Sequence, residues 1–401
     1  MWKASLAAVV VVIALPGTDV VAAEPQPFLE ELSFPTNMAF LPDGALLFTE
    51  KETGSVRLVT SGGEIAERPF VTVPVIPAAE RGLLGIAVHP EFEREPWIYL
   101  YFSDASDGLN RLVRVRADGR VAASEPEALL DGVSAVAGYH NGGDLAFAPD
   151  GTLFVALGEA HEPDRAQDEN DIGGKIVRLT ADAGVPANNP FGPDNPVWSI
   201  GHRNSFGLCV DPNTGALWET ENGPDVNDEV NLIEPGANYG WPIVTGRAGD
   251  ERFIDPTAVF ERPIALTGCA VVGSDLWFGS FDGRLWRMQA RARGGGKPAE
   301  VATFPAGVTD VVLGPDGLLY VATVDAIWTV DPDRDATTTS PAPTEPAAPS
   351  ASPQGPAIEP REGAAWQPWV AATAIVVLAG ALVARFVAGR RLRGRPPDVG
   401  R

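Results

Sequence analysis

Short apolar segments separated by turn residues recur along the chain. In each unit an apolar strand leads into a turn rich in Pro, Asp and Gly, and a second apolar strand follows, as in FLPDGALLFTE and FAPDGTLFVALGE. Proline sets φ, aspartate bonds its own backbone and glycine accepts left-handed geometry, so such turns favour tight hairpins. The units begin roughly 40 to 65 residues apart, at Phe40, Val88, Phe147, Val210, Val272 and Leu313.

Several units continue into a further strand that ends in a basic residue, at residues 54–59, 110–115, 174–179 and 283–288. The pattern predicts about four strands per unit and about six units within residues 24–332. This is the blade size of an all-β, six-bladed β-propeller, which buries each blade against its neighbours. A solenoid is the alternative, but its repeats would be shorter and more uniform. In a propeller the loops of all blades meet around a central channel, where we expect the functional site.

The two ends of the chain do not follow this pattern. Residues 1–23 combine Lys3, an apolar run and a Val-Ala-Ala tripeptide, which is typical of a cleaved signal peptide. Residues 333–365 are rich in Pro, Ala, Ser and Thr and are expected to form a disordered stalk. Residues 366–388 are apolar and long enough for one transmembrane helix. The arginines of the tail, residues 389–401, predict a type I protein of the cell membrane with the propeller outside.

Charge and cysteine content narrow the classes of partner and fold. The net charge is −23, which argues against nucleic acid or anionic lipid as a partner and favours a small neutral substrate. The only two cysteines are Cys209 and Cys269, so the fold depends on an apolar core rather than on many disulfides. They form either one bridge or two buried thiols.

One histidine is a candidate catalytic base. His140 lies in GYHNGGDLAF, directly before the third unit. Its ordinary pKa, about 6.5, makes the neutral imidazole available near pH 7. The glycines that follow allow a ligand to approach the backbone. The alternative is a loop histidine that only caps a strand, and His89, His161 and His202 are expected to be structural.

Two further loops carry polar groups. Arg203 and Asn204 stand before the fourth unit and offer a planar donor fork and an amide to a carboxylate or quinone oxygen. A structural ion pair is the alternative. Residues 223–229, GPDVNDE, gather oxygen ligands suited to calcium, although without EF-hand spacing, and a solvated acidic turn is the alternative. The sequence contains no phosphate loop, serine nucleophile elbow or zinc spacing, so nucleotide and zinc chemistry are not expected.

Together, these segments resemble one protein family. The chain contains, in this order, ERGLLGIAVHPEF, HNGGDLAFAPDGTLFVALGE, GHRNSFGL, GPDVNDEVNLIEPGANYGWP, LWFGSFDGRLWRM and VVLGPDGLLYVAT. This series, within residues 31–332, is similar to the glucose/sorbosone dehydrogenase family, the soluble quinoprotein aldose dehydrogenases. The resemblance implies a six-bladed propeller that binds pyrroloquinoline quinone (PQQ) and calcium and oxidises an aldose to its lactone.

The resemblance also implies roles for single residues. It makes His140 the base that takes a hydroxyl proton from the sugar while a hydride passes to the quinone. It makes Arg203 and Asn204 the pair that holds the quinone. The electron acceptor is not specified by the sequence.

Two calcium positions follow from the same resemblance. The backbone carbonyls of Gly223 and Pro224 would hold the calcium that polarises the cofactor. Glu229 and Tyr239 match a further calcium site. The metal beside the quinone would stabilise the negative charge that develops on its oxygen.

Several positions depart from the family pattern, mostly by loss of a cation. A glutamine is replaced by the pair Glu80-Arg81, an arginine by Asp144 and a basic residue by Asp282, and Arg-Ile-Arg-Asp becomes Gly-Val-Thr-Asp at residues 307–310. PQQ carries three carboxylates, and each charge-assisted hydrogen bond contributes on the order of 1.5–3 kcal/mol. Either other cations substitute, with Arg81, Arg165 and Arg247 as the candidates, or the site accepts a different ligand.

Two other functions therefore stay open at this stage. A propeller without the cofactor could bind a glycan or a protein at the cell surface, which the lost cations favour. A calcium-dependent hydrolase resembling lactonases would also use a propeller and a metal, but it explains the Arg203-Asn204 pair less well.

Overall fold

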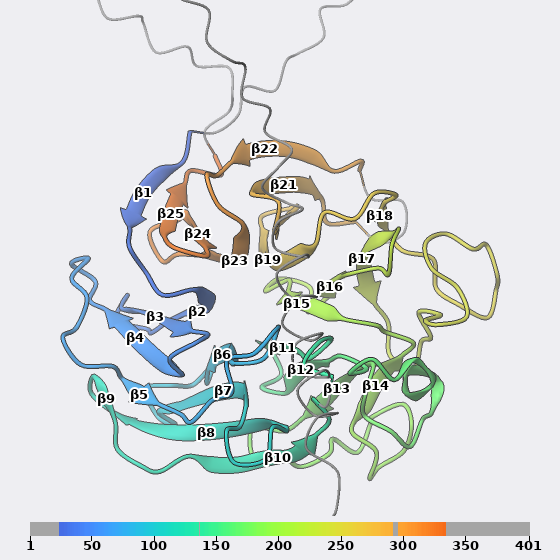
Figure 1. The fold of residues 1–401 in the computed structure, drawn as a ribbon, viewed down its shortest axis with the longest axis horizontal. Coiled ribbons are helices and arrows are strands. Elements are labelled where there is room, and N and C mark those ends of the chain that lie inside the picture. The colour runs from blue at the N-terminus through green and yellow to red at the C-terminus, as the bar shows by residue number, and fades with distance from the viewer. Residues whose placement is uncertain (1–23, 136, 292–295, 334–401) are drawn as a thin grey trace, which may run out of the picture. The chain divides into compact units, whose positions relative to one another are not determined.

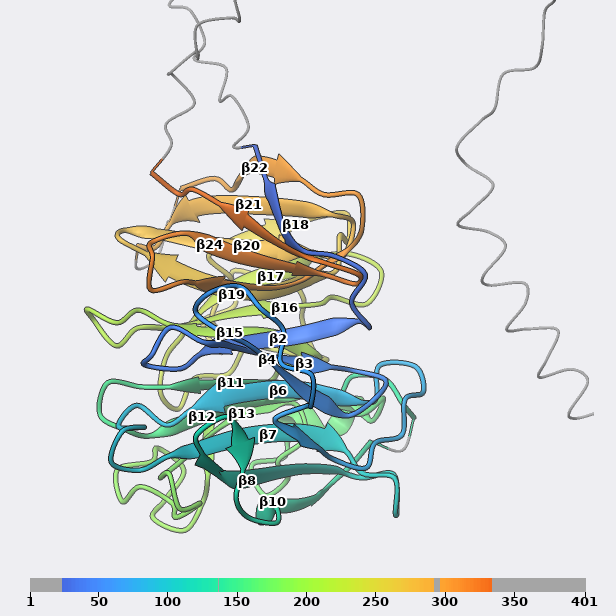
Figure 2. The same ribbon diagram turned by 90° about the vertical axis from the view of Figure 1, so that its left-hand side faces the viewer.

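The computed structural model describes residues 24–135, 137–291 and 296–333. These residues form six antiparallel sheets arranged around an axis, which confirms the predicted six-bladed β-propeller (Figure 1). Figure 2 shows the same ring of sheets from the side. The blades are numbered here in chain order of their innermost strands.

Blades one to three come from the first half of the propeller. From the axis outward, blade one consists of β2 (Pro35–Phe40), β3 (Leu46–Glu50), β4 (Ser55–Val59) and β5 (Val71–Thr72). Blade two consists of β6 (Leu83–Val88), β7 (Trp97–Ser103), β8 (Asn110–Asp118) and β10 (Glu127–Val133), with β9 (Val121–Ala122) beside β8. Blade three consists of β11 (Gly142–Phe147), β12 (Leu153–Leu157), β13 (Lys175–Leu179) and β14 (Val197–Ile200). A short 3₁₀ helix, Pro163–Gln167, lies between β12 and β13.

Blades four to six complete the ring. Blade four consists of β15 (Ser205–Val210), β16 (Leu217–Glu221), β17 (Asp228–Ile233) and β18 (Ala258–Phe260). Blade five consists of β19 (Leu266–Val272), β20 (Asp275–Ser280), β21 (Arg284–Gln289) and β22 (Ala299–Thr303). Blade six consists of β23 (Val308–Leu313), β24 (Leu319–Thr323), β25 (Ile327–Val330) and β1 (Gln26–Leu29). The ring closes because β1 pairs antiparallel with β25, so the beginning of the described chain supplies the outer strand of the last blade.

The predicted turns form as hairpins between the first and second strand of each unit. In blade three the amide of Gly151 donates to the carbonyl of Ala148 over 2.9 Å, and Asp150 Oδ1 accepts from the amide of Thr152 over 3.0 Å. Gly151 has φ of 80°, the left-handed geometry that the turn requires. The local turn chemistry therefore accounts for the position of each hairpin.

The apolar core is divided among the interfaces between blades. One cluster of buried side chains lies between each pair of neighbouring blades in the described ring. This explains why second strands such as β3, β12 and β16 are buried along their whole length, because both faces of a blade are covered.

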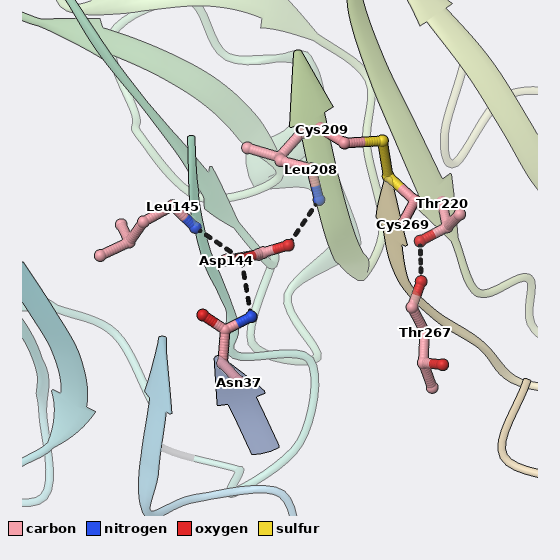
Figure 3. The surroundings of a disulfide bond; sticks show 8 residues. All are labelled: Asn37, Asp144, Leu145, Leu208, Cys209, Thr220, Thr267 and Cys269. Atoms are coloured by element: carbon pink, nitrogen blue, oxygen red, sulfur yellow. Dashed lines mark hydrogen bonds between the residues drawn. A yellow bond between two sulfur atoms is a disulfide. The ribbon is translucent and has the colours of Figure 1, made fainter. Parts of the chain in front are cut away.

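Cys209 and Cys269 form a disulfide, which decides between the two alternatives for these residues. The bond joins β15 of blade four to β19 of blade five, with 5.7 Å between the Cα atoms (Figure 3). It closes a sequence separation of 60 residues, and a bridge of this kind typically contributes about 2–4 kcal/mol to stability.

The predicted signal peptide, transmembrane helix and tail lie outside the described residues, as does the predicted stalk except for Asp333 at its start. In the part of the chain that the structure describes, no helix is long and apolar enough to cross a membrane.

Candidate functional site

The topology brings the predicted site residues to one end of the channel. His140 precedes β11, and Arg203 and Asn204 precede β15. In each blade the second strand is antiparallel to the innermost one, so the residues that follow β12 and β16 lie at this same end. Gly223 and Pro224 therefore lie at the same end of the channel as His140, and the carbonyl of Gly223 contacts Arg203.

His140 is held by two carboxylates. Its Nδ1 atom lies 2.7 Å from Oε1 of Glu159, and its backbone amide donates to Oε2 of Glu80 over 2.7 Å. Both His140 and Glu159 are buried, and His140 has φ of 54°. The ring of His161 lies 4.1 Å from the His140 ring, so this supposedly structural histidine belongs to the site.

The contact with Glu159 assigns the two ring nitrogens of His140. A carboxylate oxygen accepts a hydrogen bond from the N–H at Nδ1, and in that tautomer of the neutral imidazole the lone pair lies on Nε2. Within the described part of the chain, Nε2 has no hydrogen-bond partner. Glu159 is itself fixed, because its Oε2 accepts from the amide of Glu162 over 2.7 Å. Sequence reasoning missed Glu159, although its place at the end of a buried strand is a usable indication.

Arg203 lies across the loop that was predicted to bind calcium. Its Nη1 donates to the carbonyl oxygens of Asn222 and Gly223, each over 2.9 Å. The guanidinium lies 5.4 Å from the ring centre of Trp241. Burial lowers the pKa of Arg203, while nearby carboxylates, Glu159 first, act in the opposite direction. Arg203 forms no ion pair within the described residues.

A second cation at this end was not predicted. Lys51 follows β3, is buried, and has its ammonium 5.1 Å from the centre of the Phe34 ring. Burial lowers the pKa of Lys51, and the charges of Glu52 and Glu80 oppose that shift. Glu80 also accepts from Asn204 Nδ2 over 3.4 Å, which links this cation to the predicted quinone-binding pair.

The three arginines expected to replace the missing cations differ in the ion pairs and hydrogen bonds that they already form. Arg165 binds Asp171 and Glu162, and Arg247 donates to the carbonyl of Thr257. Arg81 packs against Gly138, and its buried Nε has no hydrogen-bond partner. Nη1 of Arg165 is also buried without a hydrogen-bond partner, so Arg165 and Arg81 each keep a donor for a ligand, and Arg81 lies beside the His140 loop. Of the departures from the family pattern, Asp282 is engaged as well, in an ion pair with Arg284.

The four residues predicted to hold calcium do come together. Gly223, Pro224, Glu229 and Tyr239 line a single small cavity of about 10 Å³, together with Glu221 and Arg203. The rest of the acidic loop has other tasks. Asp228 accepts three backbone amides, those of Gly223, Ile264 and Ala265, over 2.7–2.9 Å. Among the carboxylates of that loop, Glu229 is the one that lines the cavity.

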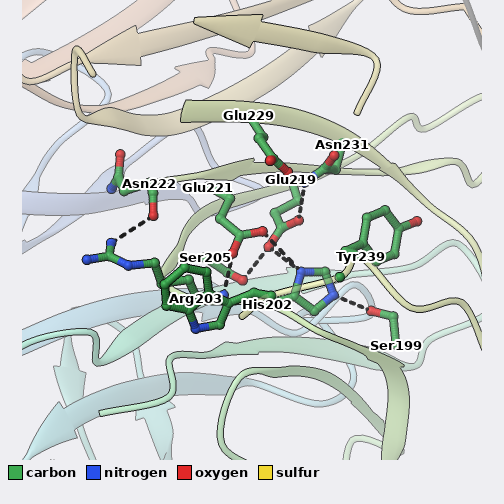
Figure 4. Close-up of polar contacts among 12 residues, drawn as sticks. Ser199, His202, Arg203, Ser205, Glu219, Glu221, Asn222, Glu229, Asn231 and Tyr239 are labelled. Carbon is green, nitrogen blue, oxygen red and sulfur yellow. Dashed lines mark hydrogen bonds and ion pairs between the residues drawn. The ribbon is translucent and has the colours of Figure 1, made fainter. Parts of the chain in front are cut away.

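A buried acidic network lies beside this cavity (Figure 4). His202 Nδ1 is 3.0 Å from Glu219 and 3.4 Å from Glu221, and its Nε2 is 2.8 Å from Ser199 Oγ. Glu229 is joined to the network by Asn231, whose Nδ2 lies 3.1 Å from Glu219 and 3.4 Å from Glu229. Sequence reasoning treated His202 as structural and did not consider Glu219 or Glu221.

The electrostatics of this network favour a bound cation. Burial alone would lower the pKa of His202, but Glu219 and Glu221 raise it to about 10, so the imidazole is protonated. Burial and the charge of Glu221 raise the pKa of Glu229 to about 8. The imidazolium of His202 thus faces two buried carboxylates, and ligand atoms of His202, Glu219 and Glu221 lie within 4.8 Å of one another. A cation would offset the remaining negative charge.

Comparisons with known proteins agree with this geometry. Residues 32–327 match the sequence model of the Glucose / Sorbosone dehydrogenase family. The aldose sugar dehydrogenase YliI of Escherichia coli (strain K12) is 31% identical over 333 residues, which cover 73% of this chain and 88% of that protein.

Two solved structures share both fold and sequence. The putative oxidoreductase (glucose dehydrogenase) of Thermus thermophilus is 35% identical, with a TM-score of 0.72, over 77% of this chain and 99% of that one. The PQQ-bound aldose sugar dehydrogenase of Streptomyces coelicolor is 32% identical, with a TM-score of 0.70, over 76% of this chain and 96% of that one. Since the family match spans most of the chain, this protein belongs to the glucose/sorbosone dehydrogenase family.

Proposed function

We propose that this protein oxidises the CH–OH group of an aldose to a lactone, with PQQ and calcium as cofactors. The observation that carries the proposal is the buried His140–Glu159 pair beside Arg203 and Asn204 at one end of the channel. Relatives of similar fold are aldose sugar dehydrogenases, and one of them is PQQ-bound.

The residues at the channel end fit an anionic quinone. Arg203 and Lys51 are cations without an ion pair in the described chain, and Arg81 adds a buried unpaired donor. The oxygens of an anionic ligand would accept hydrogen bonds from these cations. When bound, PQQ supplies the hydride acceptor and calcium polarises it.

The chain's own residues would position the sugar and move its proton. Arg203 and Asn204 would hold the cofactor, with Lys51 and Arg81 in place of the cations lost from the family pattern. Nε2 of His140 would take the hydroxyl proton, and Glu159 would stabilise the imidazolium that forms. Gly223, Pro224, Glu229 and Tyr239 would hold calcium, because they line one cavity beside an excess of buried negative charge.

A titration of the purified full-length protein with PQQ and calcium tests the cofactor. We expect a saturable change in cofactor absorbance and dye reduction with a panel of aldoses. Arg203→Gln should weaken PQQ binding roughly tenfold to a hundredfold, because one charge-assisted contact is lost. Arg252→Gln is the matched control, since Arg252 is exposed and forms an ion pair with Asp250.

Two other results would contradict this assignment. No spectral change at about tens of micromolar PQQ would reject the cofactor and favour a surface module that binds a glycan or a protein, which the loss of cations at Gly307 and Thr309 supports. Hydrolysis of lactones with calcium alone would favour a hydrolase.

We also propose that the propeller lies outside the cell membrane, tethered by residues 366–388. The disulfide supports an oxidising compartment. Protease added to intact cells should release the propeller, because the predicted stalk is an extended, accessible segment. A chain that stays intact until the cells are lysed would argue against this orientation.

A further inference from the structure

Two buried carboxylates lie within the channel, next to the site described above. Asp144 is on β11 of blade three and Asp310 is on β23 of blade six, so they approach from opposite sides of the axis. They are 7% and 2% exposed. Neither forms an ion pair with a basic side chain in the described part of the chain.

Asp144 is held by neutral donors from three blades (Figure 3). Its Oδ1 accepts from Asn37 Nδ2 over 3.1 Å and from its neighbour Leu145, and its Oδ2 accepts from the amide of Leu208 over 2.7 Å. These contacts orient both oxygens, but they bring no positive charge.

Asp310 is oriented in a similar way. Its Oδ2 accepts from the amide of Met38 over 2.8 Å. Its Oδ1 lies over Gly268, where an added Cβ would come within 2.0 Å of the oxygen, so only glycine leaves room for this carboxylate. Burial and the charge of Asp144 raise the pKa of Asp310, and burial raises that of Asp144 to about 6.

The space beside these groups is small, and several oxygen-bearing side chains line it together with Leu84 and Phe206. A cavity of about 20 Å³ is lined by Asn37, Glu80, Asn141, Asp144, Asn204 and Gly268, among others, and by no lysine or arginine. This volume is enough for about one water or one ion. Asn204 is 3% exposed, and its Oδ1 has no hydrogen-bond partner, so an unused oxygen ligand sits in the wall of the cavity.

We infer that this channel cavity binds one divalent cation through Asp144 and Asn204, which line it, at a position separate from the cavity lined by Glu229. Asp310, beside Gly268 in the cavity wall, would supply a second negative charge. Carboxylate and amide oxygens are the ligands that calcium prefers. Two buried carboxylates without a cation are unfavourable, and a bound ion would offset both charges. The family pattern has an arginine where this chain has Asp144. In this chain a bound metal ion would therefore supply the positive charge that the arginine side chain supplies in the family pattern.

Calcium binding to the full-length protein without PQQ tests the inference. Equilibrium dialysis with radioactive calcium should show one ion more in the unaltered protein than in Asp144→Asn or Asp310→Asn. Asp150→Asn is the matched control and should keep the full number, because Asp150 is an exposed partner of Arg178 on the same blade as Asp144. Equal numbers in the unaltered protein and both channel variants would overturn the inference.

A second variant gives an answer even if the channel variants do not fold. Glu229→Gln weakens the other cavity and leaves the channel untouched, so it should retain at least one calcium per chain. Complete loss of calcium binding in Glu229→Gln would refute a separate channel site. The readout is independent of the dehydrogenase proposal, because neither PQQ nor sugar is present.

Discussion

Replacing His140 with glutamine should lower the rate of aldose oxidation by roughly 10²–10⁴-fold, the usual contribution of a positioned general base. The free Nε2 of His140 is the basic atom, because Glu159 lies 2.7 Å from Nδ1. A glutamine amide accepts no proton at neutral pH. The measurement is kcat for dye-linked oxidation with the cofactor-loaded protein.

Two further variants distinguish a loss of catalysis in His140→Gln from a loss of folding. His89→Gln is the control, since His89 packs against Tyr99 and Phe147 away from the His140–Glu159 pair. Glu159→Gln should lower kcat less and shift the pH profile, because it acts through the histidine. A His140→Gln protein with unchanged kcat and unchanged PQQ affinity would remove this residue from the mechanism.

Replacing His202 with leucine should reduce the free energy of unfolding by about 3–5 kcal/mol, the usual effect of removing one partner of a buried ion pair. Glu219 and Glu221 would then be buried without their cation. The measurement is guanidinium unfolding of the full-length protein without calcium.

The pH dependence of this effect has a definite sign. The pKa of His202 is raised from 6.5 to about 10 in the folded protein. The stabilisation that protonated His202 contributes is therefore fully present at a pH below the pKa of histidine in the unfolded chain, 6.5. It is lost as the pH rises through the pKa in the folded protein, about 10. The difference in the free energy of unfolding between the unaltered protein and His202→Leu should therefore become smaller as the pH rises from 6.5 to about 10.

Substitutions of the partner carboxylates control for lost packing. Adding Glu219→Gln and Glu221→Gln to His202→Leu should recover part of the stability, because the amides carry no charge. If His202→Leu destabilises by less than about 1 kcal/mol at neutral pH, the ring is not the counter-ion of these carboxylates.

Several features were predictable because they depend on neighbouring residues. The Pro149-Asp150-Gly151 turn specifies its hairpin through contacts within a few residues, and similar turns mark the other units. Repetition of these units then indicated the number of blades. His140, Arg203 and Asn204 could be selected from sequence because they directly precede innermost strands, whose first residues lie at one end of a propeller.

Other features depend on contacts between distant residues, and no local pattern encodes them. The strand Gln26–Leu29 completes the last blade by pairing with residues about 300 positions later, as Gln26 does with Thr329. Glu159 could not be assigned to His140 until blade three was folded.

The sequence by itself determined the repeat, the turns and the loops that carry chemistry, because each of these depends on residue types a few positions apart. Only the tertiary structure decided which charges face one another. The closure of the ring brings Asp144 and Asp310 across the axis and packs Glu219 and Glu221 around His202. The energy of a buried charge depends on such neighbours in space, and the order of residues along the chain does not specify them.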